Sequence, residues 1–506
     1  MKNKLSRIGL GLSVFLMTLT SCQNDFLDKN PLDSISSATF WANEDDVNMA
    51  LAGVYARLRG GFFGYRRPWL DCYSDNAYDR FNYYNFQNLT QGIVNNTNVN
   101  SAFYDVPYQG IASSNFFLDN VDKAPIPDAR KNVVKAEARF LRALFYYDLV
   151  MSFGGVVIYK SLPATVDASK VKQSTKAEVL AFIQEDLDFA IANLPEAKYD
   201  GHAVKGTAMG LKTRVLLVQE KWADAAALAK QIMDAGTFSL APSYKGLFLT
   251  ATQNGNPEIM FSTKFLAPNN YHGDFAGSDV ELGWWGAINV YANLAEEYEM
   301  KSGKMITEAG SGYDPANPGA NRDPRLAATV RVPGEKYINP DGTEFLYSDV
   351  PQTPYMMKKY IDFSRLPFGY TKANLTDQNI VHLRYADILL MYAEAKNEAT
   401  GPDASVYAAL NQIRARPDVA MPPVNQTVYN TQAKLRDFIR HERRVELALE
   451  GYRYFDLKRW KTIEARLATV KNPAGLPLKF GEKNYVLPFP QTELDRNRQL
   501  VQNEGY

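Results

Sequence analysis

Apolar residues recur along several segments of this chain at the three- and four-residue spacing of an amphipathic helix. The clearest segment runs from Asn132 to Ser152 and is followed by the stop signal Gly154-Gly155. A second runs from Lys176 to Leu194 and ends before Pro195. This spacing gathers apolar side chains on one face, so it predicts two helices that pack as an antiparallel pair. The apolar positions of the first helix are Val134, Ala138, Leu141, Phe145 and Leu149.

More compact helical hairpins recur with a period of about 34 residues, which is the period of tetratricopeptide repeats. Each hairpin joins two amphipathic segments through a short break and is closed by Gly or Pro. The pattern predicts a mainly α fold, a tetratricopeptide-like solenoid of helix pairs. The predicted pairs are Ala203–Gln219 with Trp222–Ala235, His382–Ala399 with Asp403–Arg416, and the widely separated Asp45–Leu58 with Asp105–Val121.

Two long stretches, Gly60–Asn100 and Phe238–Gln378, interrupt the helical pattern and are rich in Gly, Pro, Asn and aromatic residues. Short alternating runs at Glu258–Phe265 and Ala328–Val332 predict a few strands there. Loops of this length in a compact protein usually serve a function, so we expect the binding half of the molecule here. The predicted organisation is a signal segment (1–21) and a single body (22–506), divided into helix pairs (22–236), an irregular region (237–380) and a last helix pair with its tail (381–506).

The amino terminus has the pattern of a bacterial lipoprotein signal. Lys2, Lys4 and Arg7 precede an apolar run from Ile8 to Leu19, and the small-residue cleavage site ends on Cys22. The run is shorter than the roughly 20 residues that a membrane-spanning helix needs. The sequence therefore predicts cleavage before Cys22 and lipidation of that cysteine, which attaches the body to a membrane.

Charge excludes one broad class of partner. The 506 residues hold 56 Lys and Arg against 56 Asp and Glu, and cleavage of the signal leaves 53 against 56. A slightly acidic body has no basic field for nucleic acid. The chain has two cysteines, so with Cys22 lipidated, Cys72 has no partner and we expect no disulfide.

Motifs of catalysis and metal binding are incomplete. His441-Glu442-Arg443-Arg444-Val445 begins like a zinc-protease helix but lacks the second histidine, and no G-x-S-x-G elbow occurs. Opposite charges on this helix favour a salt-bridged scaffold instead. We expect no catalysis, metal or cofactor. A glycosidase pair of carboxylates has no fixed spacing in sequence, so the motifs do not address it.

Aromatic residues concentrate in the two irregular stretches. Ten of the 25 residues from Phe62 to Phe86 are aromatic and are interleaved with Asp, Asn and Arg, and Trp284-Trp285 lies in a glycine-rich loop. Flat rings stack on the C–H faces of sugars, while amides, carboxylates and guanidinium groups bind the hydroxyls. The candidate glycan-binding residues are Trp69, Arg80, Asn82, Tyr83, Tyr84, Tyr271, Trp284, Trp285 and Tyr291.

Several segments in order along the whole chain resemble the SusD/RagB family of outer-membrane nutrient-uptake lipoproteins of Bacteroidota. They are Phe40-Trp41 with 45–58, 136–155, Arg322–Leu326, 382–397, 441–460, and the closing Leu487–Gln491 and Gln502–Tyr506. The resemblance implies helix pairs that carry an irregular ligand-binding half. It also implies a SusC-like TonB-dependent barrel as partner.

The resemblance further implies a protein that is lipid-anchored at the outer membrane, faces the cell exterior, captures oligosaccharides and performs no chemistry. Gln23, rather than Asp, follows the cysteine, and this too favours the outer membrane. Two alternatives stay open at the level of sequence. One is peptide capture, which belongs to a branch of the same family, and the other is a solenoid scaffold that binds only protein.

Overall fold

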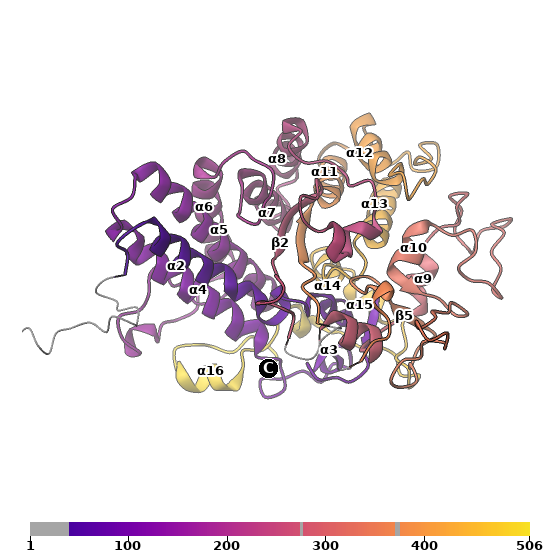
Figure 1. Ribbon diagram of the computed structural model, residues 1–506, viewed down its shortest axis with the longest axis horizontal. Helices are drawn as coiled ribbons and strands as arrows, with labels where there is room; N and C mark the ends of the chain where they lie inside the picture. Colours follow the sequence, from indigo (N-terminus) through magenta and orange to yellow (C-terminus); the bar gives the residue numbers. More distant parts are fainter. Residues whose placement is uncertain (1–39, 274–276, 370–374) are drawn as a thin grey trace, which may run out of the picture.

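The computed structural model describes residues 40–273, 277–369 and 375–506 (Figure 1). The predicted signal segment and Cys22 lie outside the described residues. The mainly α architecture is confirmed, and the long helices follow the periodic segments of the sequence. They are α2 (Glu44–Ala56), α4 (Ala102–Asn120), α5 (Asp128–Phe153), α6 (Lys176–Asn193), α7 (Lys205–Val218), α8 (Trp222–Ala235), α11 (Tyr385–Thr400), α12 (Ala404–Arg414) and α13 (Gln432–Leu447).

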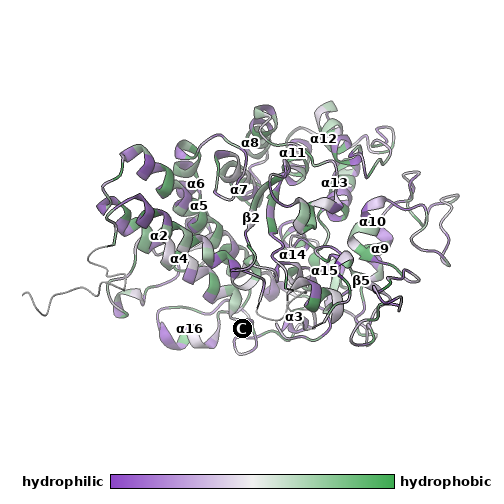
Figure 2. Cartoon of the chain, in the orientation of Figure 1, coloured by the Kyte–Doolittle hydropathy of each residue, from purple (hydrophilic) through white to green (hydrophobic). Residues whose placement is uncertain are grey.

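Local signals set the ends of these helices. Thr175 and Glu178 form a capping box at the start of α6, which satisfies backbone N–H groups that have no partner within the helix. Gly236 closes α8 in the left-handed conformation (φ 65°). Both hydrophobic and hydrophilic residues lie on α4, α5 and α6, as expected of amphipathic helices (Figure 2).

The helices form a continuous stack, although the sequence that encodes it is interrupted. Helix α5 packs on α4 and α6, α7 packs on α8, and α11 packs on α12 and also on α8. The contact between α8 and α11 joins two hairpins that are separated by about 150 residues. The irregular region therefore leaves the solenoid after α8 and returns to it at α11. Part of this region, including β5, lies on the right of Figure 1.

Short helices and two small sheets make up the rest of the molecule. Strand β2 (Ile259–Thr263) pairs antiparallel with β6 (Ile380–Arg384) near the two ends of the irregular region. The second sheet is antiparallel in the order β1 (Ala77–Asp79), β3 (Ile288–Val290), β5 (Tyr355–Met357), β4 (Val330–Arg331). The short helices are α3 (Phe86–Thr90), α9 (Ala292–Glu297), α10 (Pro324–Thr329), α14 (Arg453–Arg459), α15 (Ile463–Leu467) and α16 (Gln491–Arg496).

Two segment predictions need adjustment. Strand β2 lies within the predicted Glu258–Phe265, and β4 occupies only the end of the predicted Ala328–Val332 because α10 takes its start. Residues His382 to Arg384, predicted as the start of a helix, belong to β6 instead. All five residues of β6, including His382 and Arg384, are buried, and a short buried segment of this kind fits a strand as well as a helix.

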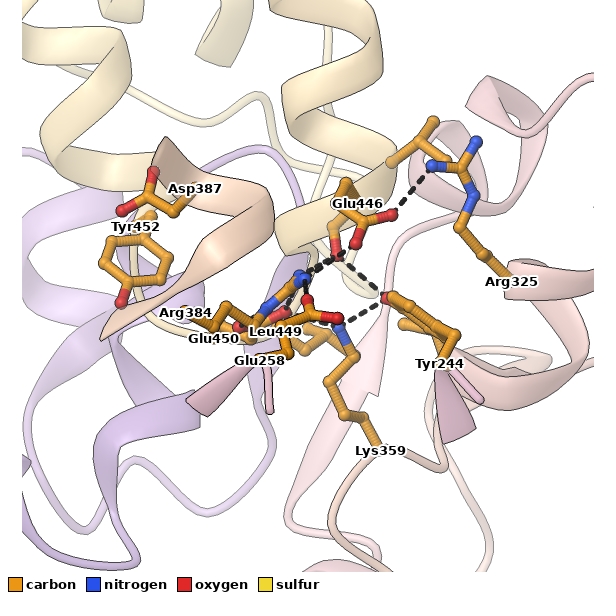
Figure 3. A network of polar contacts seen from close by, with 12 residues as sticks. Tyr244, Glu258, Arg325, Lys359, Arg384, Asp387, Glu446, Leu449, Glu450 and Tyr452 are labelled. Atoms are coloured by element: carbon orange, nitrogen blue, oxygen red, sulfur yellow. Dashed lines mark hydrogen bonds and ion pairs between the residues drawn. The ribbon is translucent and has the colours of Figure 1, made fainter. Parts of the chain in front are cut away.

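A buried network of ion pairs fastens the irregular region to the C-terminal helices (Figure 3). Arg384, at the end of β6, donates hydrogen bonds to Glu258, Glu446 and Glu450 at 2.7–2.9 Å. Lys359 donates to Glu450 at 3.0 Å. We call this network the ionic core; its residues are Glu258, Arg325, Lys359, Arg384, Arg416, Glu442, Glu446 and Glu450, all at most 1% exposed.

The ionic core corrects the interpretation of helix α13. The sequence predicts pairs between charges on the same helix, whereas Glu442 and Glu446 are bound by Arg325 of α10. Arg443 and Arg444 are also buried and pair with Asp387 and Asp75. The charged residues 442–444 and 446 of α13 therefore meet other parts of the chain rather than water. Sequence spacing on one helix does not reveal such partners.

Three arginines act on the pKa of Glu446. Burial opposes ionisation of its carboxyl group, but the guanidinium groups of Arg384, Arg416 and Arg325 outweigh burial and hold the pKa well below its ordinary value. The carboxylate is therefore charged in the folded protein. Replacement of one member of such a network leaves an uncompensated buried charge.

Candidate functional site

The small four-stranded sheet brings together the two aromatic clusters predicted from the sequence. Strands β1 and β3 pair with Ala77 opposite Val290 and Asp79 opposite Ile288. Beyond the strands, the backbone N–H of Arg80 donates to the carbonyl of Ala287 at 3.0 Å. The loop after β1 and the loop before β3 therefore lie side by side, although about 200 residues separate them.

Three rings from these two loops form a partly exposed surface, which we call the aromatic shelf: Phe81, Tyr83 and Trp285. The rings of Phe81 and Tyr83 stack at 5.2 Å with an angle of 15°, and the edge of Trp285 meets Phe81 at 6.5 Å. Tyr83 is 69% exposed, while Phe81 and Trp285 are half-buried. A large exposed ring that is held by its neighbours is a typical feature of a binding surface.

Asparagines and a buried carboxyl group shape the loop that carries Tyr83. Asn82 and Asn85 adopt positive φ angles of 53° and 59°, and the Asn82 Oδ1 accepts a hydrogen bond from the backbone of Gln87 at 2.9 Å. Burial raises the pKa of Asp79 to about 7, although backbone hydrogen bonds from the loop and one from Trp69 lower it in part. The loop is thus folded back around Asp79, and Tyr83 projects outward.

Trp284 and Trp285 are placed by a turn of π-helix, η9 (Ser278–Trp284). The backbone N–H of Trp285 donates to the carbonyl of Val280 at 2.8 Å, and Gly286 follows with φ 60°. The positive φ angle favours glycine at this position, and a Cβ there would also displace the end of the Met356 side chain, whose Cε would lie at 2.6 Å. π-Helical turns are rare in proteins overall, and those that occur are often found at functional sites.

A pocket of about 660 Å³ opens beside the shelf, within the range of ligand pockets in proteins. Residues 331–335, which begin at the end of β4, line one side, and residues 345–347, 349–354 and 356, which lead into β5, line the other. Arg331 is fixed at its wall, because its guanidinium donates to the carbonyl of Glu335 at 2.9–3.0 Å and lies 5.1 Å from the Tyr347 ring. Leu346 and Val350 are 72% and 84% exposed.

Arg80 connects the shelf with the pocket. Its guanidinium lies 4.9 Å from the ring of Phe81, donates to the carbonyl of Trp285 at 3.2 Å and pairs with Asp349 of the pocket at 3.5 Å. The backbone N–H of Ser348 also donates to the carbonyl of Trp284 at 2.9 Å. The shelf and the pocket therefore form one continuous surface with a paired cation and anion between them.

Two of the candidate glycan-binding residues, Trp69 and Tyr291, do not present an exposed ring. Trp69 is 1% exposed within the 3₁₀-helix η4 (Arg67–Tyr73), and Tyr291 is 5% exposed at the end of β3. Both rings lie in the hydrophobic core. Trp69 still acts on the shelf indirectly, because its side chain hydrogen-bonds to Asp79 beneath the loop.

Three other predicted residues do not add an exposed ring to the shelf. Tyr84 is half-buried, its ring meets Trp69 at 5.8 Å, and the Arg66 guanidinium lies 4.9 Å from its centre. Asn82 is a turn residue, as described above. Tyr271 is half-buried beside His272, whose ring stacks on Tyr65 at 5.0 Å rather than on the shelf.

Sequence reasoning missed the segment 345–356. It holds the pocket residues Tyr347 and Asp349, and its Gln352 backbone N–H donates to Asn289 Oδ1 at 2.7 Å. The sequence has a usable signal in this segment, since Pro351 and Pro354 enclose polar residues next to tyrosines. Its aromatic density is modest, however, so aromatic clustering does not distinguish it from other loops.

The arrangement suits recognition of a flat polar ligand. The exposed ring of Tyr83 offers an apolar face, and the Arg80–Asp349 pair offers planar donors and acceptors at its edge. Among residues 40–273, 277–369 and 375–506, no group of three His, Cys, Asp or Glu side chains is arranged to hold a metal ion. In the same part of the chain no helix is long and apolar enough to cross a membrane.

A stack of helix pairs that carries an irregular, aromatic surface defines a class of binding protein, and comparison with known proteins identifies the family. Residues 252–506 match the model of the "SusD family", and residues 25–217 match that of "Starch-binding associating with outer membrane". The chain belongs to the SusD family.

Individual relatives cover nearly the whole chain. A SusD-like protein of Formosa agariphila is 28% identical over 88% of this chain and 89% of its own length. The crystal structure of a SusD-like carbohydrate binding protein from Bacteroides fragilis superposes with a TM-score of 0.80 at 27% identity, over 92% of this chain and 100% of that one. A laminarin binding SusD-like protein superposes with a TM-score of 0.68 at 25% identity, also over 92% and 100%.

Proposed function

We propose that this protein is a surface-exposed, lipid-anchored glycan-binding protein that captures oligosaccharides at the aromatic shelf and its pocket. It passes them to a SusC-like TonB-dependent barrel in the outer membrane and catalyses no reaction. The observation that carries the proposal is the Tyr83 ring, which is 69% exposed yet stacked on Phe81 beside a pocket of about 660 Å³. The carbohydrate-binding and laminarin-binding relatives support the same class of ligand.

The test of ligand class is calorimetric titration of the full chain in mild detergent. The probes are five neutral hexasaccharides: laminarihexaose, cellohexaose, maltohexaose, mannohexaose and xylohexaose. We expect saturable binding of at least one, with a Kd of about 1 μM to 1 mM, since a few stacked rings and hydrogen bonds give modest affinity. Binding of tryptic casein peptides in place of every sugar would establish the peptide alternative. Binding of neither class would leave only a protein-binding solenoid, and both results would overturn glycan capture.

The anchor is tested by Cys22→Ser. We expect the variant to lose palmitate labelling and to leave the outer-membrane fraction, because the proposal gives the body no other attachment. Protease accessibility of the wild-type body on intact cells tests its outward orientation. Unchanged fractionation of the variant would contradict a lipid anchor at this cysteine.

The partner is tested by gentle solubilisation of membranes and capture of the tagged chain. A lid over a transporter is expected to co-purify with an outer-membrane barrel. Recovery of this chain alone under several mild detergents would count against that part of the proposal and would leave glycan binding itself untouched.

A further inference from the structure

A second hollow is lined by residues of α4 and α16, two elements that lie on the opposite side from β5 in Figure 1. It has a volume of about 530 Å³ and is enclosed by α4, by the segment 159–169 and by α16. This volume is within the range of sites that bind small ligands. We call it the α4 groove. None of the candidate site residues lines it.

Two tyrosine rings of the groove are held in place by their own hydroxyl groups. The Tyr108 hydroxyl donates to the carbonyl of Val157 at 2.8 Å, and the Tyr159 hydroxyl donates to the carbonyl of Ser169 at 2.6 Å. The rings meet edge to face at 5.8 Å, and both side chains are half-buried. Since the hydroxyl groups are already bonded within the protein, the groove is left with fixed, apolar ring surface.

Polar side chains without a protein partner stand at the rim of the groove. Asp105 is half-buried and Gln109 is exposed, and neither side chain hydrogen-bonds to another residue in the described part of the chain. On the other side, Glu493 accepts a hydrogen bond from Arg496 at 2.6 Å. The rim thus holds two carboxylates and one guanidinium group, which disfavours a phosphate, a sulfate or an acidic sugar.

Fixed aromatic walls with hydrogen-bond acceptors at the edge are suited to the same kind of ligand as the shelf. A sugar residue offers C–H faces to rings and hydroxyl protons to carboxylate and amide oxygens. We propose that the α4 groove is a second saccharide-binding site, which holds a short stretch of a neutral glycan. The inference takes its ligand class from the proposed function, but it rests on different residues.

Two separate sites would change how the protein holds a long chain. A polysaccharide that occupies both the shelf and the α4 groove is bound more tightly than at either site alone, because the second contact is intramolecular. An oligosaccharide too short to span the two sites gains nothing from the second. Two sites therefore favour capture of long chains while short products still dissociate.

The test uses Ala112, which is exposed on α4 and lines the groove. Ala112→Trp fills the groove without touching the core, and Ala112→Ser at the same position leaves it open. Hydrogen exchange of the full chain is followed by mass spectrometry with each of the five neutral hexasaccharides. We expect at least one sugar to protect residues 104–115 and 159–169. This protection should be at least tenfold weaker in Ala112→Trp and Asp105→Ala and unchanged in Ala112→Ser and Tyr83→Ala.

The outcomes separate the two proposals. Protection of the loops around Tyr83, Trp285 and Asp349 alone would overturn the second site and leave the proposed function standing. Protection in neither place would contradict both. Groove protection that persists in Ala112→Trp, with an unchanged melting temperature, would show that the sugar does not occupy the groove and would also overturn the inference.

Discussion

The ionic core and the aromatic shelf invert the usual distribution of residue types. In the ionic core, charged side chains such as Arg384 and Glu446 are at most 1% exposed, whereas on the shelf Tyr83 is 69% exposed. Charged residues are rarely buried unless paired, and large aromatic residues are on average well buried. Each region departs from the rule for a different reason: the core joins two parts of the chain, and the shelf keeps a surface available to a ligand.

The two regions also differ in what holds them together. The ionic core uses long-range charged hydrogen bonds between the irregular region and the C-terminal helices, with many partners for each group. The shelf uses short turns, ring stacking and one partly exposed ion pair, Arg80–Asp349. Changes in the first are therefore expected to alter stability, and changes in the second are expected to alter binding.

The largest expected effect is on the ionic core. Arg384→Met removes a cation that bonds to three buried carboxylates and should lower the free energy of unfolding by about 5 kcal/mol. Lys230→Met is the matched control, because Lys230 pairs with Asp234 at the exposed i,i+4 position. Its cost should be far smaller, because an exposed ion pair contributes little to stability. Equal costs for the two variants, measured by urea unfolding, would remove the distinction between the core and surface pairs.

A slightly smaller loss is expected at Trp69, which lies beneath the shelf. Trp69→Ala should destabilise the fold by about 4 kcal/mol, since it empties a large core site and removes a hydrogen bond to Asp79. Any loss of sugar binding should then follow from unfolding or from a disordered Tyr83 loop. A stable variant that loses binding would make Trp69 a contact residue and would contradict its position in the core.

A third effect depends on pH and concerns His441, which lies between Glu297 and Glu299 at 3.1 and 3.5 Å. Burial disfavours its charged form, but hydrogen bonds to these two carboxylates outweigh burial and raise the pKa of His441 to about 9. The folded protein then holds a proton that the unfolded chain releases near pH 6.5. The contribution of this proton to the free energy of unfolding is present in full below pH 6.5 and is lost as the pH rises through 9.

The contribution amounts to at most about 3 kcal/mol. Burial lowers the pKa of Lys458 to about 7, so this group makes the folded protein more stable as the pH rises, opposite to His441. The pH dependence of the free energy of unfolding of the wild type alone therefore does not isolate the effect of His441. The informative quantity is the difference between the wild type and His441→Gln in the free energy of unfolding. It should shrink between pH 6.5 and pH 9. A difference that is constant over this range would contradict a charged His441.

The sequence predicts the scaffold better than the site. Periodicity along Asn132–Ser152 defines α5 because one apolar face must pack, whatever its neighbour is. Trp69 and Tyr83 lie in the same aromatic run, and only the fold of η4 and the turn at Asn82 directs one inward and the other outward. The pairing of Arg384 with Glu446 depends on a contact between distant segments, so it is not visible in the sequence pattern. The same is true of the segment 345–356, which reaches the shelf through Arg80 and Trp284.

The most direct measurement combines binding and melting for Tyr83→Ala. Phe116→Ala is the control, because Phe116 is 47% exposed on α4 and lines neither the shelf pocket nor the α4 groove. Calorimetry with the hexasaccharide that binds the wild type most tightly should give at least tenfold weaker affinity for Tyr83→Ala. The melting temperature should stay within a degree or two of the wild type, since an exposed ring contributes little to stability. Unchanged affinity at an unchanged melting temperature would contradict the account.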